Sequence, residues 1–370
     1  MIIGILKEPI TENRVSLLPE AVAILTKKNI KVVVEANAGL NAYATNEAYI
    51  QAGATLVNDS EVLQMSTIVL SIHKPINVSA GDKVFIGMYN PLSEYDTMQQ
   101  WSSTGATVFS LEMLPRTTRA QSMDVLSSQA NIAGYKAVLK AAGIFPRYMP
   151  MFMTAAGSIA PAKVLILGAG VAGLQAIATA KRLGAVIEVF DTRPAVKEEV
   201  QSLGAKFVEV EGAADASQAG GYGVEQTEEY KQKQQQRIAE SIAKADIVIS
   251  TAQIPGRKAP LLIPTSMVNG MKPGSVIIDL AASTGGNCEL TINNETVLHN
   301  GIQIVGDSYL PNQMPLDASK LYGKNVLNFL QLILDNENNL NLNWDDELVT
   351  GCAVTHAGKV IHPAVEKLLA

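Results

Sequence analysis

Short apolar runs rich in β-branched residues alternate with helix-like segments along the 370-residue chain. Between residues 1 and 110 a helix is predicted at Pro19–Lys28, between the first two of these runs. Strands that alternate with helices form parallel sheets covered by helices on both faces. This first array therefore predicts an α/β domain. Its expected strands are Ile2–Leu6, Lys31–Val34, Thr67–Ile72, Lys83–Ile86 and Thr107–Phe109.

A second array of the same kind follows a helix predicted at Gln129–Ala142. Six parallel strands with a glycine turn after the first are typical of a doubly wound dinucleotide-binding fold. Helix resumes at Asn325–Leu334, where no further strand remains for it to support, so we expect the chain to return there to the first domain. The expected strands are Lys163–Leu167, Val186–Asp191, Lys206–Val210, Asp246–Ser250, Ser275–Asp279 and Gln303–Val305.

The predicted fold is thus α/β, with two Rossmann-like doubly wound parallel-sheet domains, the second inserted into the first. A chain of 370 residues is too long for one ordinary core and fits two domains. The predicted limits are residues 1–137 with 310–370 for the first domain and residues 138–309 for the second.

Charge and cysteine content exclude several classes of protein. The net charge of −6 leaves no basic surface for nucleic acid or for an anionic membrane. Cys288 and Cys352 stand far apart, which argues for a reducing compartment and against a disulfide framework or a zinc site. No histidine pair has metal-ligand spacing, so no metal is expected.

Two further patterns argue against secretion and against insertion into a membrane. Lys7 and Glu8 bring charge too early for a signal peptide. The uncharged stretch between Lys163 and Lys181 is 17 residues long and contains three glycines. A membrane-spanning helix needs about 20 apolar residues. We therefore expect a cytoplasmic chain without direct membrane insertion.

The strongest chemical motif is the run Gly168-Ala169-Gly170-Val171-Ala172-Gly173, between the apolar strand KVLIL and a helix. In such a turn the first glycine permits the bend, the second lets the backbone approach a pyrophosphate, and the third allows close packing of helix on strand. The helix N-terminus, including Val171 and Ala172, supplies N–H donors to the phosphates.

The next strand ends in Asp191, near the expected spacing of about 20 residues for an acid that binds the adenosine ribose. A carboxylate there repels a 2′-phosphate and favours NAD(H) as cofactor. Arg193 complicates this interpretation because an arginine can pair with that phosphate; the alternative is a solvated cation just past the strand.

Further cofactor contacts are expected where neighbouring strands end, because ligands in such sheets bind at the carboxyl ends of the strands. These positions are Thr251, Ala252 and Ala281. The glycine-rich and glutamine-rich segment Glu211–Arg237 contains Tyr222 and is either a lid that closes over a ligand or an exposed insertion.

The densest polar string precedes the predicted helix at 129–142 and reads PRTTRAQSMDVLSSQANIAGY. Capping of a helix by Ser122 or Asp124 is one explanation. Capping needs only one or two polar residues, so a ligand site between the domains explains the surplus better. The candidate site residues in this string are Arg116, Gln121, Asp124 and Ser127.

This string and the following MTAAGSIAPAKVLILGAGVAGLQAIATAKRLGA resemble proton-translocating NAD(P) transhydrogenase, in the NAD(H)-binding first domain of its alpha subunit. The resemblance runs from GILKEP and ENRVSLLPE to HPA near the end. It implies that Arg116, Gln121 and Asp124 hold the nicotinamide and that Ser127 contacts it. It further implies that Gln121 bridges toward NADP(H) on a partner, and that Tyr222 lies on a mobile loop.

The resemblance also implies a reaction and partners. Hydride would pass from NADH to NADP⁺, coupled to proton translocation by membrane subunits. In some bacteria the alpha subunit is split into two polypeptides, and this chain is similar to the first of them. The implied partners are an NADP(H)-binding subunit, membrane-spanning subunits and a second copy of the chain, at the cytoplasmic face of the bacterial inner membrane.

Alanine dehydrogenase, which shares the fold and the ENR motif, is the alternative. Amino-acid oxidation needs a positioned acid–base group, whereas hydride exchange between two nicotinamides needs only orientation. The dehydrogenase's catalytic histidine is missing from the matching segment FIGMYNPL, and Ser283 replaces its catalytic aspartate. Arg14 and Lys74 match its substrate-binding cations, and we expect them to be structural here. A third possibility is a cofactor-sensing protein with an inactive site, against which the intact polar string argues.

Met149, Met151 and Met153 form an apolar run before the glycine turn. Such a run is either part of the core or an exposed patch at a dimer interface, and the sequence favours neither.

Overall fold

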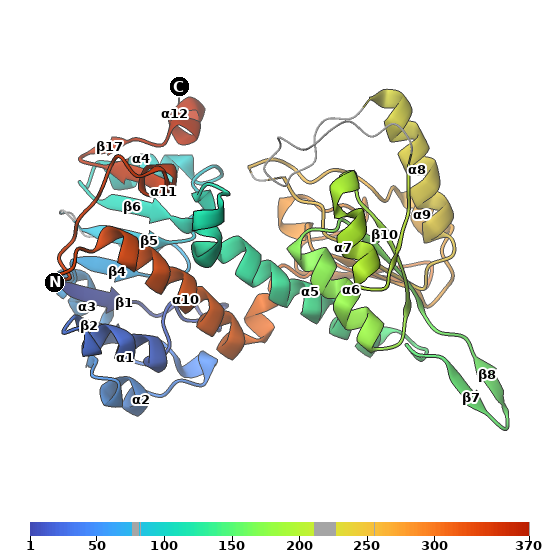
Figure 1. The fold of residues 1–370 in the computed structure, drawn as a ribbon, viewed down its shortest axis with the longest axis horizontal. Helices are drawn as coiled ribbons and strands as arrows, with labels where there is room; N and C mark the ends of the chain where they lie inside the picture. The colour runs from blue at the N-terminus through green and yellow to red at the C-terminus, as the bar shows by residue number, and fades with distance from the viewer. Residues whose placement is uncertain (76–80, 82, 211–226, 255, 370) are drawn as a thin grey trace. The chain divides into compact units, whose positions relative to one another are not determined.

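A computed structural model of the chain describes residues 1–75, 81, 83–210, 227–254 and 256–369. The chain forms two compact units, unit 1 from Met1–Gln129 and Asn312–Ala370 and unit 2 from Ala130–Pro311 (Figure 1). The first division falls inside helix α5 (Val125–Ile144). Both units are Rossmann-like, and the second interrupts the first in sequence, as predicted. The domain limits given above stay a prediction.

The sheet of unit 1 has the order β17-β16-β6-β5-β4-β1-β2-β3. Strands β1 to β6 are parallel and follow the doubly wound order 3-2-1-4-5-6, while β16 and β17 continue the sheet in antiparallel fashion. The prediction missed β3, β16 and β17. The strands are β1 (Ile2–Ile5), β2 (Lys31–Glu35), β3 (Thr55–Val57), β4 (Ile68–Leu70), β5 (Val84–Gly87), β6 (Thr107–Ser110), β16 (Ala353–His356) and β17 (Lys359–Val360).

Alternation along these strands feeds two cores, one on each face of the sheet. Ile68 and Leu70 of β4 pack with one cluster, and Val69 between them packs with the other. Helices α1 (Pro19–Lys27), α2 (Asn46–Gln51) and α10 (Pro315–Ile333) contribute to the first cluster. Helices α3 (Asp59–Met65), α4 (Tyr95–Ser102) and α12 (Pro363–Leu369) contribute to the second. Helix α11 (Glu347–Cys352) leads into β16.

Helix α10 confirms that the chain returns to unit 1, although it begins ten residues earlier than predicted, at Pro315. Its buried face includes Tyr322, Phe329 and Ile333, all without exposed surface. Proline at the first helical position is compatible with the missing N–H and explains the early start.

Unit 2 repeats the same strand order, β11-β10-β9-β12-β13-β15-β14, with all strands parallel except β14. The six predicted strands are confirmed, and antiparallel β14 was missed. Its strands are β9 (Lys163–Leu167), β10 (Val186–Phe190), β11 (Lys206–Phe207), β12 (Ile247–Ser250), β13 (Val276–Asp279), β14 (Thr296–His299) and β15 (Ile302–Val305).

Helices cover both faces of this sheet as well. Helices α5, α6 (Val171–Arg182) and α7 (Lys197–Ser202) pack in one cluster. Helices α8 (Glu228–Ile242) and α9 (Thr265–Asn269) pack in the other. Helix α8 contains the glutamine-rich run, so the expectation of a structureless segment up to Arg237 was wrong for residues 228–237. A capped, amphipathic helix with Tyr230 and Ile238 buried forms there instead.

A two-stranded hairpin of β7 (Phe152–Thr154) and β8 (Gly157–Ile159) projects from unit 2 (Figure 1). It contains part of the methionine run and splits that run between the two expected environments. Met149 is buried in the core of unit 2, whereas Met151 and Met153 are 61% and 75% exposed. In the part of the chain that the structure describes, no helix is long and apolar enough to cross a membrane.

Gly134 brings α5 against the start of α6. A Cβ atom on Gly134 would lie 2.1 Å from the carbonyl oxygen of Ala172, whereas one on Gly143, further along α5, would meet no atom within 4 Å. Both changes to alanine raise helix propensity equally. Only the first forces two backbones apart.

We therefore expect Gly134→Ala to lower the free energy of unfolding of unit 2 by about 1–3 kcal/mol. Gly143→Ala, the matched control, leaves stability unchanged or raises it by up to about 1 kcal/mol. Urea unfolding followed by circular dichroism measures both. Equal stability of the two variants would show that α5 and α6 separate without cost.

Candidate functional site

The glycine turn at the carboxyl end of β9 shows three distinct environments. Gly168 has a φ of +102°, and a Cβ there would lie 2.4 Å from the Thr251 hydroxyl. A Cβ on Gly173 would lie 1.9 Å from the carbonyl oxygen of Gly168. Gly170 alone opens into free space, and no side chain caps helix α6, which begins after it. The first-turn N–H groups of α6 can therefore serve an anionic ligand at this position.

Asp191 follows β10, and its carboxylate is fully engaged. Oδ2 accepts bonds from the Ala169 N–H (2.7 Å) and Arg193 Nη2 (2.7 Å). Oδ1 accepts bonds from the Arg193 N–H (2.8 Å) and Nε (2.9 Å). Arg193 is thus not a solvated cation, and its ion pair with Asp191 raises the pKa of the guanidinium. A carboxylate has about four lone-pair sites, so a ribose hydroxyl can bind Asp191 only by displacing one of these donors.

Thr251 and Ala252 lie directly after β12, next to β9 in the sheet. The Thr251 hydroxyl lies 3.2 Å from the Leu167 carbonyl oxygen and 3.1 Å from that of Gly168. Ala281, after β13, is fully buried, and its N–H donates to Asp279. These positions share one edge of the sheet with Gly168 and Asp191, but Ala281 supports its own loop from beneath. Direct cofactor contacts at all of them stay predictions.

Two buried polar residues, Asp279 and Asn287, shape this edge, and sequence reasoning did not assign them to the site. Both are without exposed surface. Asp279 Oδ2 accepts bonds from the N–H groups of Asn287 (2.7 Å) and Cys288 (3.0 Å) and from the Thr291 hydroxyl (2.7 Å). The asparagine in TGGNC was the available signal, but its partners lie far away in sequence.

The polar string of unit 1 forms a 3₁₀ helix at Thr118–Met123 followed by α5. Asp124 caps α5: its Oδ1 accepts a bond from the Ser127 N–H (2.8 Å) and its Oδ2 one from the Ser127 hydroxyl (2.6 Å). The Ser122 carbonyl accepts bonds from Asn325 and Asn328 of α10. The side chains of Arg116 and Gln121 are exposed at this rigid turn. The structure thus brings together Asp124 and Ser127, and presents Arg116 and Gln121 to solvent.

Arg14 and Lys74, the two cations shared with alanine dehydrogenase, are each paired with a glutamate. The Arg14 guanidinium donates to both oxygens of Glu12 (2.8 and 2.7 Å) and to Gln129 Oε1 (2.8 Å). Lys74 is bonded to Glu94. Glu12 also lies 2.8 Å from His73 Nε2, and these partners hold the pKa of Glu12 at about 2 against the opposing effect of burial. Both cations have structural partners, as expected.

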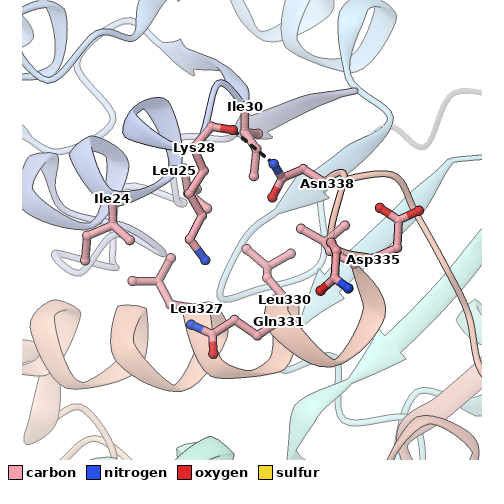
Figure 2. A pocket seen from close by; sticks show the side chains of 11 residues that line it. Ile24, Leu25, Lys28, Ile30, Leu327, Leu330, Gln331, Asp335 and Asn338 are labelled. Atoms are coloured by element: carbon pink, nitrogen blue, oxygen red, sulfur yellow. Dashed lines mark hydrogen bonds between the residues drawn. The ribbon is translucent and has the colours of Figure 1, made fainter.

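Two remaining features lie elsewhere. Tyr222 falls outside the described residues. A cavity of about 460 Å³ in unit 1 lies between the C-terminal ends of α1 and α10 (Figure 2). Its walls include Leu25, Lys28 and Ile30, which directly precede β2 and so mark the amino edge of the sheet. Ligands of such sheets bind at the opposite edge.

The fold and the glycine turn define a two-domain Rossmann-type protein. Residues 4–133 match the N-terminal domain of alanine dehydrogenase/PNT, and residues 137–363 match its C-terminal domain. The chain belongs to the alanine dehydrogenase/PNT family, a family of oxidoreductases.

Transhydrogenases are the more similar branch of this family. The chain is 43% identical to the first part of the NAD(P) transhydrogenase alpha subunit of Rhodospirillum rubrum over 367 residues, 96% of each chain. The transhydrogenase structure from Sinorhizobium meliloti matches with a TM-score of 0.86 and 41% identity, covering 98% of this chain and 100% of that one. Alanine dehydrogenase of Mycolicibacterium smegmatis is 26% identical over 381 residues, 99% of this chain and 96% of that one.

Burial of Glu8 beside Glu12 predicts a pH-dependent stability of unit 1. Desolvation raises the pKa of Glu8 to about 7, although its carboxylate accepts bonds from the Ile72 and His73 N–H groups. An acid whose folded-state pKa is raised stabilises the fold fully below its unfolded pKa, and this contribution is lost as pH rises through the folded pKa. The loss therefore falls between about pH 4.5 and pH 7.

We expect wild type to lose about 3 kcal/mol of unfolding free energy relative to Glu8→Gln across this window. Urea unfolding followed by tryptophan fluorescence reports on unit 1, because Trp101 and Trp344 both lie in it. Glu20→Gln on the exposed surface of α1 is the control and keeps the wild-type slope. Parallel pH profiles for wild type and Glu8→Gln would contradict the assignment.

Proposed function

We propose that the chain is the NAD(H)-binding subunit of a proton-translocating NAD(P) transhydrogenase and passes hydride from NADH to NADP⁺ held by a partner subunit. The open position at Gly170, between two glycines that are fully enclosed, carries this proposal. Such a gap beside uncapped helix N–H groups fits a pyrophosphate. The similarity to transhydrogenase subunits then selects the reaction.

The residues of unit 2 fit NAD(H). The N–H groups of Val171, Ala172 and Gly173 would face the pyrophosphate, and Asp191 would bind the adenosine ribose by exchanging a bond with Arg193. Because the Arg193 guanidinium is already neutralised by Asp191, it offers little attraction to a 2′-phosphate. This pairing favours NAD(H) over NADP(H) on this chain.

The polar turn of unit 1 would hold the nicotinamide. Bound NADH supplies the hydride, so the protein has only to orient the ring and exclude competing reactions. Asp124 and Ser127 are held rigidly by their mutual bonds, while Arg116 and Gln121 extend from the same turn. We assign Gln121 to the contact with the partner's NADP(H).

The proposed partners follow from the reaction. NADP⁺ would be held by a separate subunit, and proton translocation would belong to membrane-spanning subunits, since the described residues of this chain include no helix that could cross a membrane. The relatives are themselves named as subunits, and one as the first portion of the alpha subunit. We therefore place the chain peripherally at the cytoplasmic face of the bacterial inner membrane.

The experiment mixes the purified chain with an isolated NADP(H)-binding domain of a transhydrogenase and follows hydride transfer from NADH to an NADP⁺ analogue. Reduction of NAD⁺ by L-alanine is assayed in parallel. Transfer that requires the partner domain supports the proposal. Alanine-dependent NADH formation by the chain alone would instead establish the alternative, an NAD-dependent amino-acid dehydrogenase.

Gln121→Asn tests the role of the turn. The side chain is shortened by one methylene, so we expect hydride transfer to slow about tenfold or more while the affinity for NADH changes less than about twofold. Stopped-flow mixing and NADH fluorescence measure the two quantities. Gln331→Asn on α10 is the control and alters neither. Equal losses in transfer and in NADH affinity would reduce Gln121 to a simple cofactor ligand.

We also propose a homodimer, formed through the β7–β8 hairpin. Tyr148, Met151, Phe152, Met153 and Ile159 are 55%, 61%, 44%, 75% and 38% exposed. Clustered apolar side chains on a projecting ribbon are typical of an interface, and an isolated two-stranded ribbon is at best marginally stable. A second copy of the chain would cover this surface.

The double change Met151→Ser and Met153→Ser should weaken dimerisation by about tenfold or more, because it removes the most exposed apolar side chains of the hairpin. Sedimentation equilibrium gives the dissociation constant. Met65→Ser, at an exposed methionine on α3 of unit 1, serves as the control and should have no effect. A wild-type chain that sediments as a monomer would end the homodimer proposal.

A further inference from the structure

Asn287 joins three loops at the carboxyl edge of the unit 2 sheet. Its Oδ1 accepts a bond from the Ala252 N–H (3.1 Å), and its Nδ2 donates to the carbonyl oxygens of Ala252 (2.9 Å) and Pro260 (2.9 Å). The side chain therefore grips both polar groups of one peptide residue at the end of β12. No exposed surface remains on Asn287.

Asn287 is itself held from behind. Its N–H donates to Asp279 Oδ2 (2.7 Å), and its carbonyl accepts bonds from Leu262 (2.8 Å) and Ile263 (2.9 Å). Every hydrogen-bonding atom of the residue is used, as a buried polar network requires. The chain of contacts runs from Asp279 at the end of β13, through Asn287, to Ala252 at the end of β12.

Ala252 follows Thr251, whose hydroxyl bonds to the carbonyl of Gly168 in the glycine turn. A shift of the Ala252 peptide would thus be transmitted to the turn. Since both backbone groups of Ala252 bond to Asn287, a ligand can meet Ala252 only through its methyl group. Ala252 shapes the crevice, and Asn287 determines where that shape lies.

We infer that Asn287 is a positioning residue for the dinucleotide, which acts by fixing the Ala252 peptide beside the glycine turn. The inference rests on the proposed function, because it takes the crevice at the ends of β9 and β12 as the NAD(H) site. It predicts that the donor character of the Asn287 amide, and not only its volume, governs NADH affinity.

Asn287→Asp tests this donor character. The new side chain has nearly the same shape, but ionised it sets a carboxylate against the carbonyl oxygens of Ala252 and Pro260. Protonated, it can still donate one bond. The titratable groups around it are Asp279, bonded to the 287 N–H; Cys288, whose pKa burial raises to about 11; and Lys258, whose side chain lies beside Gly285.

NADH dissociation constants are measured by fluorescence at two pH values for wild type and variant. We expect Asn287→Asp to bind about tenfold or more weakly than wild type near pH 8, and within about threefold near pH 5.5. A merely structural role would lower stability but leave the affinity of the folded protein the same at both pH values. Asn300→Asp, at an exposed asparagine of unit 2, is the charge-matched control and follows wild type.

Asn287→Ser provides a second test should the aspartate variant not fold. It is neutral and shorter, so we expect about three- to tenfold weaker NADH binding at both pH values. Wild-type affinity in either folded variant near pH 8 would overturn the role of Asn287 and leave the proposed function standing. Failure of the wild-type chain to bind NADH would overturn the proposed function and this inference with it.

Discussion

The carbonyl oxygen of Gly168 occupies the place where a side chain on Gly173 would begin, 1.9 Å from the ideal Cβ position. Helix α6 can therefore start directly on the end of β9, and its first N–H groups open onto the crevice. The same turn is tied from both sides, by the Asp191 carboxylate on Ala169 and by the Thr251 hydroxyl on Gly168. The arrangement of β10 and β12 around β9 depends on this contact.

The two units share one strand order but differ at the edge where ligands bind. In unit 2 that edge is backbone: a glycine turn, a bare helix start, and loops held by buried Asp279 and Asn287. In unit 1 the equivalent edge is filled by charged side chains, with Glu12 engaging both Arg14 and His73. A dinucleotide needs close approach to backbone N–H groups, so only the second edge suits it. The repeated fold therefore does not imply two cofactor sites.

Buried parallel strands were predictable because each is a continuous apolar run: β9 was predicted at its observed bounds, Lys163–Leu167. The missed strands are short and lie at or near sheet edges, where β3 and β17 have no fully buried residue. The glycine spacing and Asp191 were readable because neighbours in sequence make the turn. Asn287 was not, since its partner Ala252 lies 35 residues away and only the folded sheet brings them together.

Asp124 shows that structural and functional explanations of one residue can agree. As the cap of α5 it satisfies the Ser127 N–H, and the Ser127 hydroxyl returns a bond to its second oxygen. Capping alone would account for the aspartate. It does not account for the exposed Arg116 and Gln121 on the preceding turn, which α10 braces through Ser122. A turn held this firmly restricts the directions in which its exposed side chains can reach, and hydride transfer between two rings demands that restriction.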